Sequence, residues 1–298
     1  MHYGKLKNGH LAAIIDNTII GLVEAASRLG RPLPATDLYA LIAAGEQAQQ
    51  ATQELAQEAL QQNVACQGYD SKLLQTPLGK AQRNIFCIGK NYADHAAEIA
   101  AKLDAESDLP KHPIVFTKAT NTLIGPNDDI PLHAGVTEKI DYEGELAIVI
   151  GKRASNISAD DAWQHVFGFS CYNDVSARDL QRRHTQWHIG KSLDGFGPMG
   201  PVVTPTHGKP LDGKVRLTCA VNGEVRQDAT LDLMIFDVPT IIATLSKGIT
   251  LEAGDVIATG TPAGVGMGFT PSKFLQSGDK VEVAIDGTLP LVNYVQQG

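Results

Sequence analysis

The sequence is poor in cysteine and in long apolar runs, and each shortage excludes a class of protein. Its four cysteines, Cys66, Cys87, Cys171 and Cys219, stand far apart and form no Cys-x-x-Cys pair. This spacing indicates neither a disulfide framework nor a zinc site, and it is typical of a reducing cytoplasm. No window approaches the roughly 18 apolar residues that a membrane-spanning helix needs, and the N-terminus has no stretch of signal-peptide type. We therefore expect a cytoplasmic protein that does not bind membranes.

Positive charge is also scarce. The formal net charge is −8, and lysine and arginine are spread along the 298 residues without a run. Nucleic acid is therefore not an expected partner. A chain of this length can bury a large core and carry an appendage, so we expect two structural units.

The first unit is predicted over residues 1–80 as a small α+β element. Residues 10–25 indicate a hairpin, with Asp16-Asn17 as the turn between two apolar runs, followed by a helix. Residues 37–62 have the helical spacing and the alanine, glutamine, glutamate and leucine content of a helix with a polar surface. We expect this unit to cap the core or support a dimer, without chemistry of its own.

Residues 81–298 are predicted to form a second, β-rich domain. Short β-branched runs alternate there with glycine, proline, asparagine and aspartate, which favours a closed or rolled sheet. Asn222-Gly223 fits a type I′ hairpin turn. The stretch 187–201 is interpreted as a loop because it is rich in glycine and proline. The expected strands are 84–89, 113–116, 146–150, 167–172, 215–221, 256–258 and 281–285.

Two carboxylates stand at the start of an apolar strand. Glu143 and Glu145 flank Gly144 and precede the run Leu146–Ile150, so their side chains would share one face of the strand. Like charges this close at a core edge repel unless a cation or protons hold them. Mg²⁺, Mn²⁺ and Ca²⁺ take such oxygen ligands. A solvated strand end is the alternative interpretation of the motif.

A second polar segment begins where the strand 84–89 ends at glycine. His95 and Glu98 lie three residues apart on the helix expected there. A carboxylate bonded to imidazole fixes its tautomer and raises its basicity, so the pair could activate water. The alternative is an ordinary exposed helix pair.

Further candidates follow the strand 167–172. Asp174 could supply a third carboxylate to the metal, and Arg178 could bind a substrate carboxylate or form a structural salt bridge with Asp179. Lys191 could complement an anionic substrate or an enolate, although surface lysines are commoner. The stretch 254–266 ends a strand in glycines whose N–H groups could hold a carboxylate, and it lacks the ending of a Walker phosphate loop.

Together these segments resemble the fumarylacetoacetate hydrolase family, particularly its acylpyruvase and fumarylpyruvate hydrolase members, over residues 84–298. The resemblance implies a mixed β-roll or β-sandwich core, a frequent homodimer and a small variable N-terminal unit. The motifs that carry it are Gly89-Lys-Asn-Tyr-Ala-Asp-His95-x-x-Glu98, Phe116-Thr-Lys118, Glu143-Gly-Glu145, Asp174-x-x-x-Arg178-Asp179-x-Gln181, Lys191, Val221-Asn-Gly-Glu224-x-x-Gln227 and Thr259-Gly-Thr261-Pro-x-Gly-Val-Gly266.

The resemblance also implies roles for single residues. It implies that Lys191 meets the substrate carboxylate or developing enolate, that Lys118 supports the carboxylates, and that 97–111 is a mobile lid over the site. The implied ligands of Mg²⁺ or Mn²⁺, with Ca²⁺ as a further option, are Glu143, Glu145 and Asp174; the implied water-activating dyad is His95 and Glu98; the implied substrate contacts are Arg178, Gln181 and Thr261.

The function expected on this basis is hydrolysis of a carbon–carbon bond in an acylpyruvate-like 1,3-diketo acid, such as fumarylpyruvate or a related product of aromatic ring cleavage. Alternatives with the same metal–enolate chemistry are an oxaloacetate decarboxylase and a tautomerase or isomerase of a hydroxydienedioate. A catalytically idle metal-binding protein is a further alternative. One departure from the family pattern is the cationic run Arg182-Arg183-His184, which could select a dicarboxylate.

Overall fold

The N-terminal strands form a meander that continues into the main sheet. The computed structural model describes residues 1–103 and 109–297. Asp16 and Asn17 have φ angles of 44° and 59°, as a two-residue hairpin turn requires, so the predicted hairpin is confirmed. The elements of this region are β1 (His2–Leu6), β2 (Leu11–Ile15), β3 (Thr18–Gly21), α1 (Leu22–Leu29), α2 (Leu38–Gln61), β4 (Cys66–Gly68) and β5 (Leu74–Gln75).

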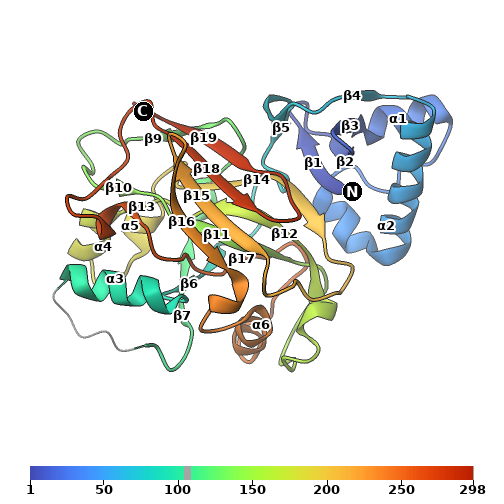
Figure 1. The fold of residues 1–298 in the computed structure, drawn as a ribbon. Helices are drawn as coiled ribbons and strands as arrows, with labels where there is room; N and C mark the ends of the chain where they lie inside the picture. The colour runs from blue at the N-terminus through green and yellow to red at the C-terminus, as the bar shows by residue number, and fades with distance from the viewer. Residues whose placement is uncertain (104–108, 298) are drawn as a thin grey trace.

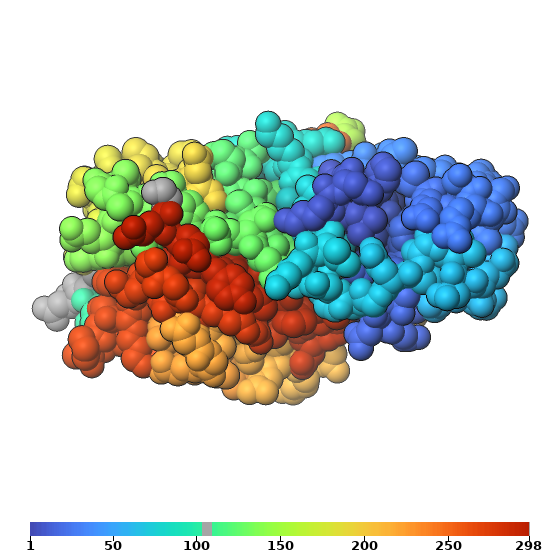
Figure 2. Space-filling view, turned by 90° about the horizontal axis from the view of Figure 1, so that it is seen from above, coloured from blue at the N-terminus to red at the C-terminus, as the bar shows by residue number. Residues whose placement is uncertain are grey.

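The helix predicted over 37–62 is confirmed as α2. Asp37 caps it by accepting a hydrogen bond from the backbone N–H of Ala40 at 2.9 Å. Gly45 interrupts the helix with a φ of 78°, which glycine adopts without strain. Figure 2 shows the N-terminal residues gathered at one end of the molecule.

The largest sheet joins both halves of the chain in the order β4-β3-β2-β1-β14-β12-β11-β17-β6-β7. Tyr3 of β1 pairs with Val203 of β14, so the N-terminal strands extend the sheet of the remaining chain. Whether residues 1–80 form a separate domain stays a prediction. The other strands are β6 (Ile85–Gly89), β7 (Ile114–Lys118), β11 (Gly144–Ile150), β12 (Val166–Asn173), β14 (Gly197–Pro205) and β17 (Val256–Ala258).

A second sheet covers one face of the first, and Figure 1 shows it lying in front of β11 and β12. Its order is β16-β15-β18-β19-β9, and Leu217 and Val283 of this sheet belong to the same buried cluster as Leu146. The β-rich mixed fold that the sequence predicts is therefore confirmed. The strands are β9 (Asp129–Pro131), β15 (Arg216–Val221), β16 (Glu224–Thr230), β18 (Lys280–Ile285) and β19 (Leu291–Gln296). Short pairings are made by β8 (Leu123–Ile124), β10 (Ile140–Asp141) and β13 (Ser176–Ala177).

Strand β11 is buried along its whole length because both of its faces are covered. Leu146, Ile148 and Ile150 face the cluster beneath the second sheet. Ala147 and Val149 face the cluster that includes the N-terminal elements. A strand covered on both sides has a continuous apolar sequence. The polar residues at its start are consequently held inside the protein.

Four further helices follow β6 along the chain, and no helix in the described part of the chain is long and apolar enough to cross a membrane. They are α3 (Ala93–Leu103), α4 (Arg178–Arg183), α5 (His188–Lys191) and α6 (Val238–Ser246).

The interpretation of 187–201 as a loop is wrong in both halves, since His188–Lys191 form α5 and β14 begins at Gly197. The glycines in this strand permit close approach of its neighbours, since a Cβ at Gly197 would lie 2.7 Å from the Tyr172 hydroxyl oxygen. Pairing with β12 and β1 therefore outweighs the weak strand propensity of glycine and proline.

Candidate metal and substrate site

Three buried carboxylates meet at the ends of two neighbouring strands. Glu143 precedes β11, Glu145 lies within it, and Asp174 follows β12. The antiparallel register places Gly144 opposite Asn173, and the backbone N–H of Asp174 donates to the carbonyl of Glu143 at 2.8 Å. One oxygen from each carboxylate lies within 4.8 Å of the others. Because all three side chains are buried, the solvated strand end is excluded.

Cationic side chains surround these acids. The Nζ atom of Lys191 lies 2.6 Å from Glu143 Oε2 and 2.7 Å from Asp174 Oδ2. Lys118 donates to Asp174 and, at 2.9 Å, to the carbonyl of Val175. Nη2 of Arg178 forms an ion pair with Glu143 Oε1 at 2.7 Å. Lys191 is therefore not a surface lysine, since its side chain is 2 % exposed.

The charges are not balanced equally across the cluster. Burial raises the pKa of Glu143, but Lys191 and Arg178 overcome this effect and hold that pKa well below its usual range. Burial, Asp174 and Glu143 together raise the pKa of Glu145 well above its usual range. A hydrogen bond from the Gly260 N–H at 2.9 Å lowers it only in part. The fit to a metal rests on this imbalance: a hard divalent cation would satisfy Glu145 and bind all three acids.

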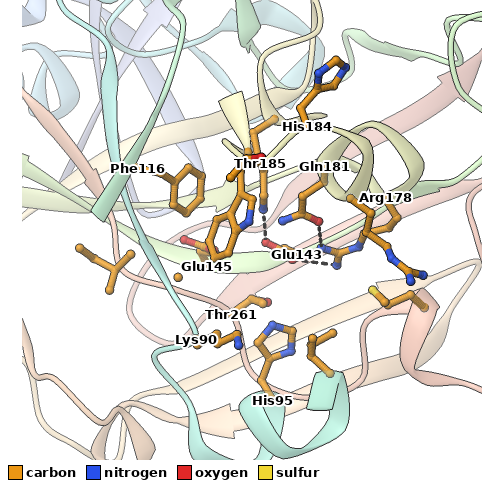
Figure 3. Close-up of a pocket in the computed structure, with 17 residues that line it drawn as sticks. Lys90, His95, Phe116, Glu143, Glu145, Arg178, Gln181, His184, Thr185 and Thr261 are labelled. Carbon is orange, nitrogen blue, oxygen red and sulfur yellow. Dashed lines mark hydrogen bonds and ion pairs between the residues drawn. The ribbon is translucent and has the colours of Figure 1, made fainter. Parts of the chain in front are cut away.

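His95 and Glu98 reach the same site from α3. The side chain of His95 is 7 % exposed, and its Nδ1 lies 3.4 Å from Glu98 Oε2. Glu98 also accepts the N–H of Gly264 at 3.0 and 3.2 Å. The pair is consequently not an exposed helix pair. Figure 3 shows His95 pointing from α3 toward Glu143, on the side of the cavity opposite His184 and Thr185.

A cavity of about 400 Å³ is lined by His95, Glu143, Glu145, Arg178 and Lys191. Phe116 and Trp187 form one apolar wall, with ring centroids 5.2 Å apart in an edge-to-face arrangement. Gly89 is required behind this wall, since a Cβ there would lie 2.5 Å from the Trp187 ring. Sequence reasoning missed both aromatic residues as site components. Their only signal is that Phe116 begins the Phe-Thr-Lys motif and Trp187 lies four residues before Lys191.

The three expected substrate contacts all line the cavity, and each is already engaged. Nη1 of Arg178 donates to Gln181 Oε1 at 3.1 Å, while Nε donates to Asp141. The hydroxyl of Thr261 donates to the carbonyl of Gly144 at 2.9 Å. The suggested salt bridge between Arg178 and Asp179 is wrong, because Arg178 pairs with acids of another segment. Asp179 instead accepts hydrogen bonds from Thr137, Glu138 and Leu180.

The three residues of the cationic run 182–184 do not all reach the cavity. Arg182 and His184 line the cavity, whereas Arg183 is not among the lining residues. The lid predicted over 97–111 is described only in part: residues 97–103 belong to α3, and 104–108 lie outside the described residues.

We expect Lys118→Met to lower the free energy of unfolding by up to about 3–5 kcal/mol, the cost of breaking a buried ion pair, because Asp174 then keeps only Lys191 as a cationic partner. Lys118 and Asp174 are both fully buried, so water cannot replace the lost ammonium. Urea unfolding in the presence of a chelator measures the change. Lys152→Met, which removes the exposed pair with Glu46, is the control and should leave the unfolding midpoint unchanged. Equal midpoints for the two variants would contradict this prediction.

Comparisons with known proteins match this chain to a protein family and to similar sequences and solved structures. A family model described as fumarylacetoacetate (FAA) hydrolase C-terminal matches residues 84–296. The chain is 46 % identical over 296 residues to the protein named oxaloacetate tautomerase YisK of Bacillus subtilis, covering 96 % of this chain and 97 % of that one. It also resembles the solved fumarylacetoacetate hydrolase from Exiguobacterium antarcticum, with 37 % identity, a TM-score of 0.83 and full coverage of both chains. A third relative is maleylpyruvate hydrolase from Sphingobium sp. SYK-6, solved with manganese(II) and pyruvate, with 27 % identity, a TM-score of 0.77 and full coverage of both chains.

Proposed function

Because this chain belongs to the fumarylacetoacetate hydrolase family, we propose that it is a metal-dependent enzyme that interconverts the keto and enol forms of oxaloacetate or a closely similar 2-oxo-dicarboxylate. The observation that carries the proposal is one cavity in which His95, backed by Glu98, faces Lys191 and the carboxylate cluster. The similarity to an oxaloacetate tautomerase over nearly the whole length supports this reaction ahead of the hydrolysis expected from sequence.

The cavity suits a small dianion. Its lining includes the cationic side chains of Lys90, Arg178, Arg182 and Lys191, together with the imidazole of His184. Burial opposes the charge of Lys191, but Asp174 and Glu143 raise its pKa above the usual value, so it remains an ammonium at neutral pH. Lys191 and Arg178 can therefore orient a substrate carboxylate or oxyanion.

Tautomerisation needs one proton to move from carbon to oxygen. His95 is placed to accept the proton from C3, and Glu98 stabilises the imidazolium that results. The C–H electrons form the C2–C3 double bond, and the developing oxyanion then takes the proton that His95 has accepted. The imidazole is neutral again, and the enol leaves with no net change in atoms. When bound, a divalent metal at Glu143, Glu145 and Asp174 would polarise the carbonyl and stabilise the developing negative charge.

The test follows enol oxaloacetate as it converts to the keto form, by loss of enol absorbance, with Mg²⁺ or Mn²⁺ and with a chelator. We expect the enzyme to accelerate the approach to equilibrium without changing the final keto to enol ratio, and the chelator to abolish the acceleration. Proton NMR in D₂O would show faster exchange at C3. No acceleration with either metal would overturn the proposal.

Hydrolysis of an acylpyruvate is the second candidate, and the His95–Glu98 pair favours it because such a dyad can deprotonate water. A maleylpyruvate hydrolase among the solved relatives supports the same chemistry. Release of equimolar pyruvate and carboxylic acid from acylpyruvates or fumarylpyruvate would identify this activity. Release of carbon dioxide from oxaloacetate would identify decarboxylation, and no turnover of any of these compounds would favour an idle metal-binding protein.

We expect Arg182→Ala to lower kcat/KM about fivefold for dicarboxylic substrates and little for monocarboxylic ones. An exposed ion pair contributes up to about 1 kcal/mol, which corresponds to this factor. Arg183→Ala is the matched control, because Arg183 follows Arg182 directly in the sequence and its side chain does not line the cavity. Steady-state kinetics on both substrate classes measure the effect. Unchanged discrimination in Arg182→Ala would remove the basis for dicarboxylate selection.

The homodimer and the cytoplasmic location belong to the same proposal. All four cysteines are free thiols, and three of them are buried, which suits a reducing compartment. Light scattering coupled to size-exclusion chromatography measures the mass in solution, and a mass twice that of one 31.8 kDa chain is expected.

A further inference from the structure

Asp141 is a fully buried carboxylate that contacts two separate parts of the site. It ends β10, two residues before Glu143. Its Oδ2 accepts the Nε of Arg178 at 2.9 Å and the backbone N–H of Met267 at 3.0 Å. Its Oδ1 accepts the backbone N–H of Gly266 at 2.6 Å. One side chain thus joins Arg178 to the loop 264–268, which we name the docking loop.

The docking loop fits against Asp141 only with glycine at position 266. A Cβ on Gly266 would lie 2.6 Å from Asp141 Oδ1 and 2.4 Å from the carbonyl oxygen of Lys273. The loop is fixed a second time by Tyr142, whose hydroxyl donates to the carbonyl of Gly264 at 2.8 Å. Two consecutive residues, Asp141 at the end of β10 and Tyr142 just after it, therefore hold the loop at Gly266–Met267 and at Gly264.

The docking loop in turn holds α3. The N–H of Gly264 donates to both oxygens of Glu98, and a Cβ at Gly268 would lie 2.0 Å from Glu98 Oε1. Lys102 of α3 donates to the carbonyl of Phe269 at 2.6 Å, just beyond the loop. The position of His95 on α3 consequently depends on where the loop lies.

We propose that Asp141 is a positioning residue that couples Arg178 to the docking loop and, through Gly264 and Glu98, sets His95 over the cavity. The inference rests on the proposed function for its kinetic consequence. Its structural consequence, the placement of α3, does not depend on the proposed function, because the contacts that connect Asp141 to α3 exist without substrate. Asp141 touches none of the reacting atoms in this scheme.

Hydrogen exchange of the metal-loaded protein tests the structural part. In Asp141→Asn, one oxygen becomes an amide nitrogen that cannot accept, so the bonds to Arg178, Gly266 and Met267 cannot all persist. We expect amide exchange in α3 and the docking loop to accelerate about ten- to hundredfold. Losing one hydrogen bond to a charged acceptor makes local opening more favourable, and the exchange rate rises in proportion to the open population. Exchange in β1 to β4 should stay unchanged. Acceleration spread over the whole chain, or none in α3, would overturn the proposal.

Kinetics test the coupling. We expect Asp141→Asn to lower kcat about 10²-fold, as a misplaced catalytic group does, and to raise KM through Arg178. In a Glu98→Ala background, which removes both oxygens that accept the Gly264 N–H, the same change should alter kcat by no more than about twofold, because the connection to His95 is already broken. Additive losses in kcat would assign Asp141 a purely structural role.

Asp255 provides the matched control. It is a buried carboxylate that accepts Nη1 of Arg83 at 2.7 Å and the backbone N–H of Glu252 at 2.8 Å, and it is not among the residues that line the cavity. Asp255→Asn should lower the melting temperature without accelerating exchange in α3. If Asp141→Asn does not fold, Tyr142→Phe removes the other anchor of the docking loop and should accelerate the same peptides less strongly.

The outcomes separate the two proposals. Accelerated exchange in α3 together with an inactive wild-type protein would overturn the proposed function and keep the positioning role. Normal exchange in α3 in Asp141→Asn and in Tyr142→Phe, together with tautomerase activity in the wild type, would overturn the positioning role and keep the function.

Discussion

Glu145→Gln is expected to lower turnover of oxaloacetate by about 10³-fold or more and to abolish the thermal stabilisation by Mg²⁺ or Mn²⁺. The amide keeps the size of the side chain but removes the charge that a hard cation requires. Loss of several kcal/mol of electrostatic stabilisation at the developing oxyanion corresponds to a factor of this size. Removing the metal from the wild type with a chelator should have the same effect as the substitution.

The pKa of Glu145 also leads us to expect that metal affinity depends on pH. Burial, Asp174 and Glu143 hold the pKa of Glu145 above its ordinary value of 4.5, so the metal-free folded protein keeps a proton that the unfolded chain has already lost. This proton contributes stability that is fully present below pH 4.5 and is lost as the pH rises through the folded pKa. A metal competes with that proton, so its affinity should increase with pH over the same interval.

Thermal shift and isothermal titration between pH 5 and pH 8, with and without Mn²⁺, measure both effects. Glu252→Gln, which changes an exposed glutamate paired with Arg153, is the control and should bind metal as the wild type does. Normal metal stabilisation in Glu145→Gln, or an affinity that does not change with pH, would contradict the assignment of Glu145 as a ligand.

His95→Ala is expected to lower kcat about 10²- to 10⁴-fold, the usual loss when a general base is removed. Metal binding should remain, because the three carboxylates lie at the start of β11 and just after β12, and none of them is on α3. Glu98→Gln should have a smaller effect, since the imidazole is kept and only its carboxylate partner is lost. Single-turnover kinetics, with metal content measured for each variant, separate the chemical step from binding.

His165→Ala supplies the comparison for this substitution, because His165 is half-buried, does not line the cavity, and places its Nδ1 3.3 Å from the carbonyl oxygen of Lys152. Its turnover should equal that of the wild type. If His95→Ala retained full turnover with its metal bound, a different residue would have to move the proton, and Lys90 in the cavity lining would be the next to examine.

Local sequence patterns were sufficient to predict those turns and helix ends that are specified by one or two neighbouring residues. Asp16-Asn17 specifies its turn because both residues tolerate positive φ, and Asp37 specifies the start of α2 by capping it. Strand β14 could not be predicted in this way. Its glycines and prolines oppose a strand locally, and only the neighbours β12 and β1 stabilise it.

The sequence by itself determined the carboxylate pair, since alternation along a strand places Glu143 and Glu145 on one face, and it determined the helical spacing of His95 and Glu98. The tertiary structure decided which charges meet. The register of β11 and β12 brings Asp174 to the pair, and the packing places Lys191 between Glu143 and Asp174 and directs Arg178 to Asp141 in place of Asp179. The physical reason is that ion pairing and desolvation depend on distances between residues remote in the chain, which spacing along the sequence does not contain.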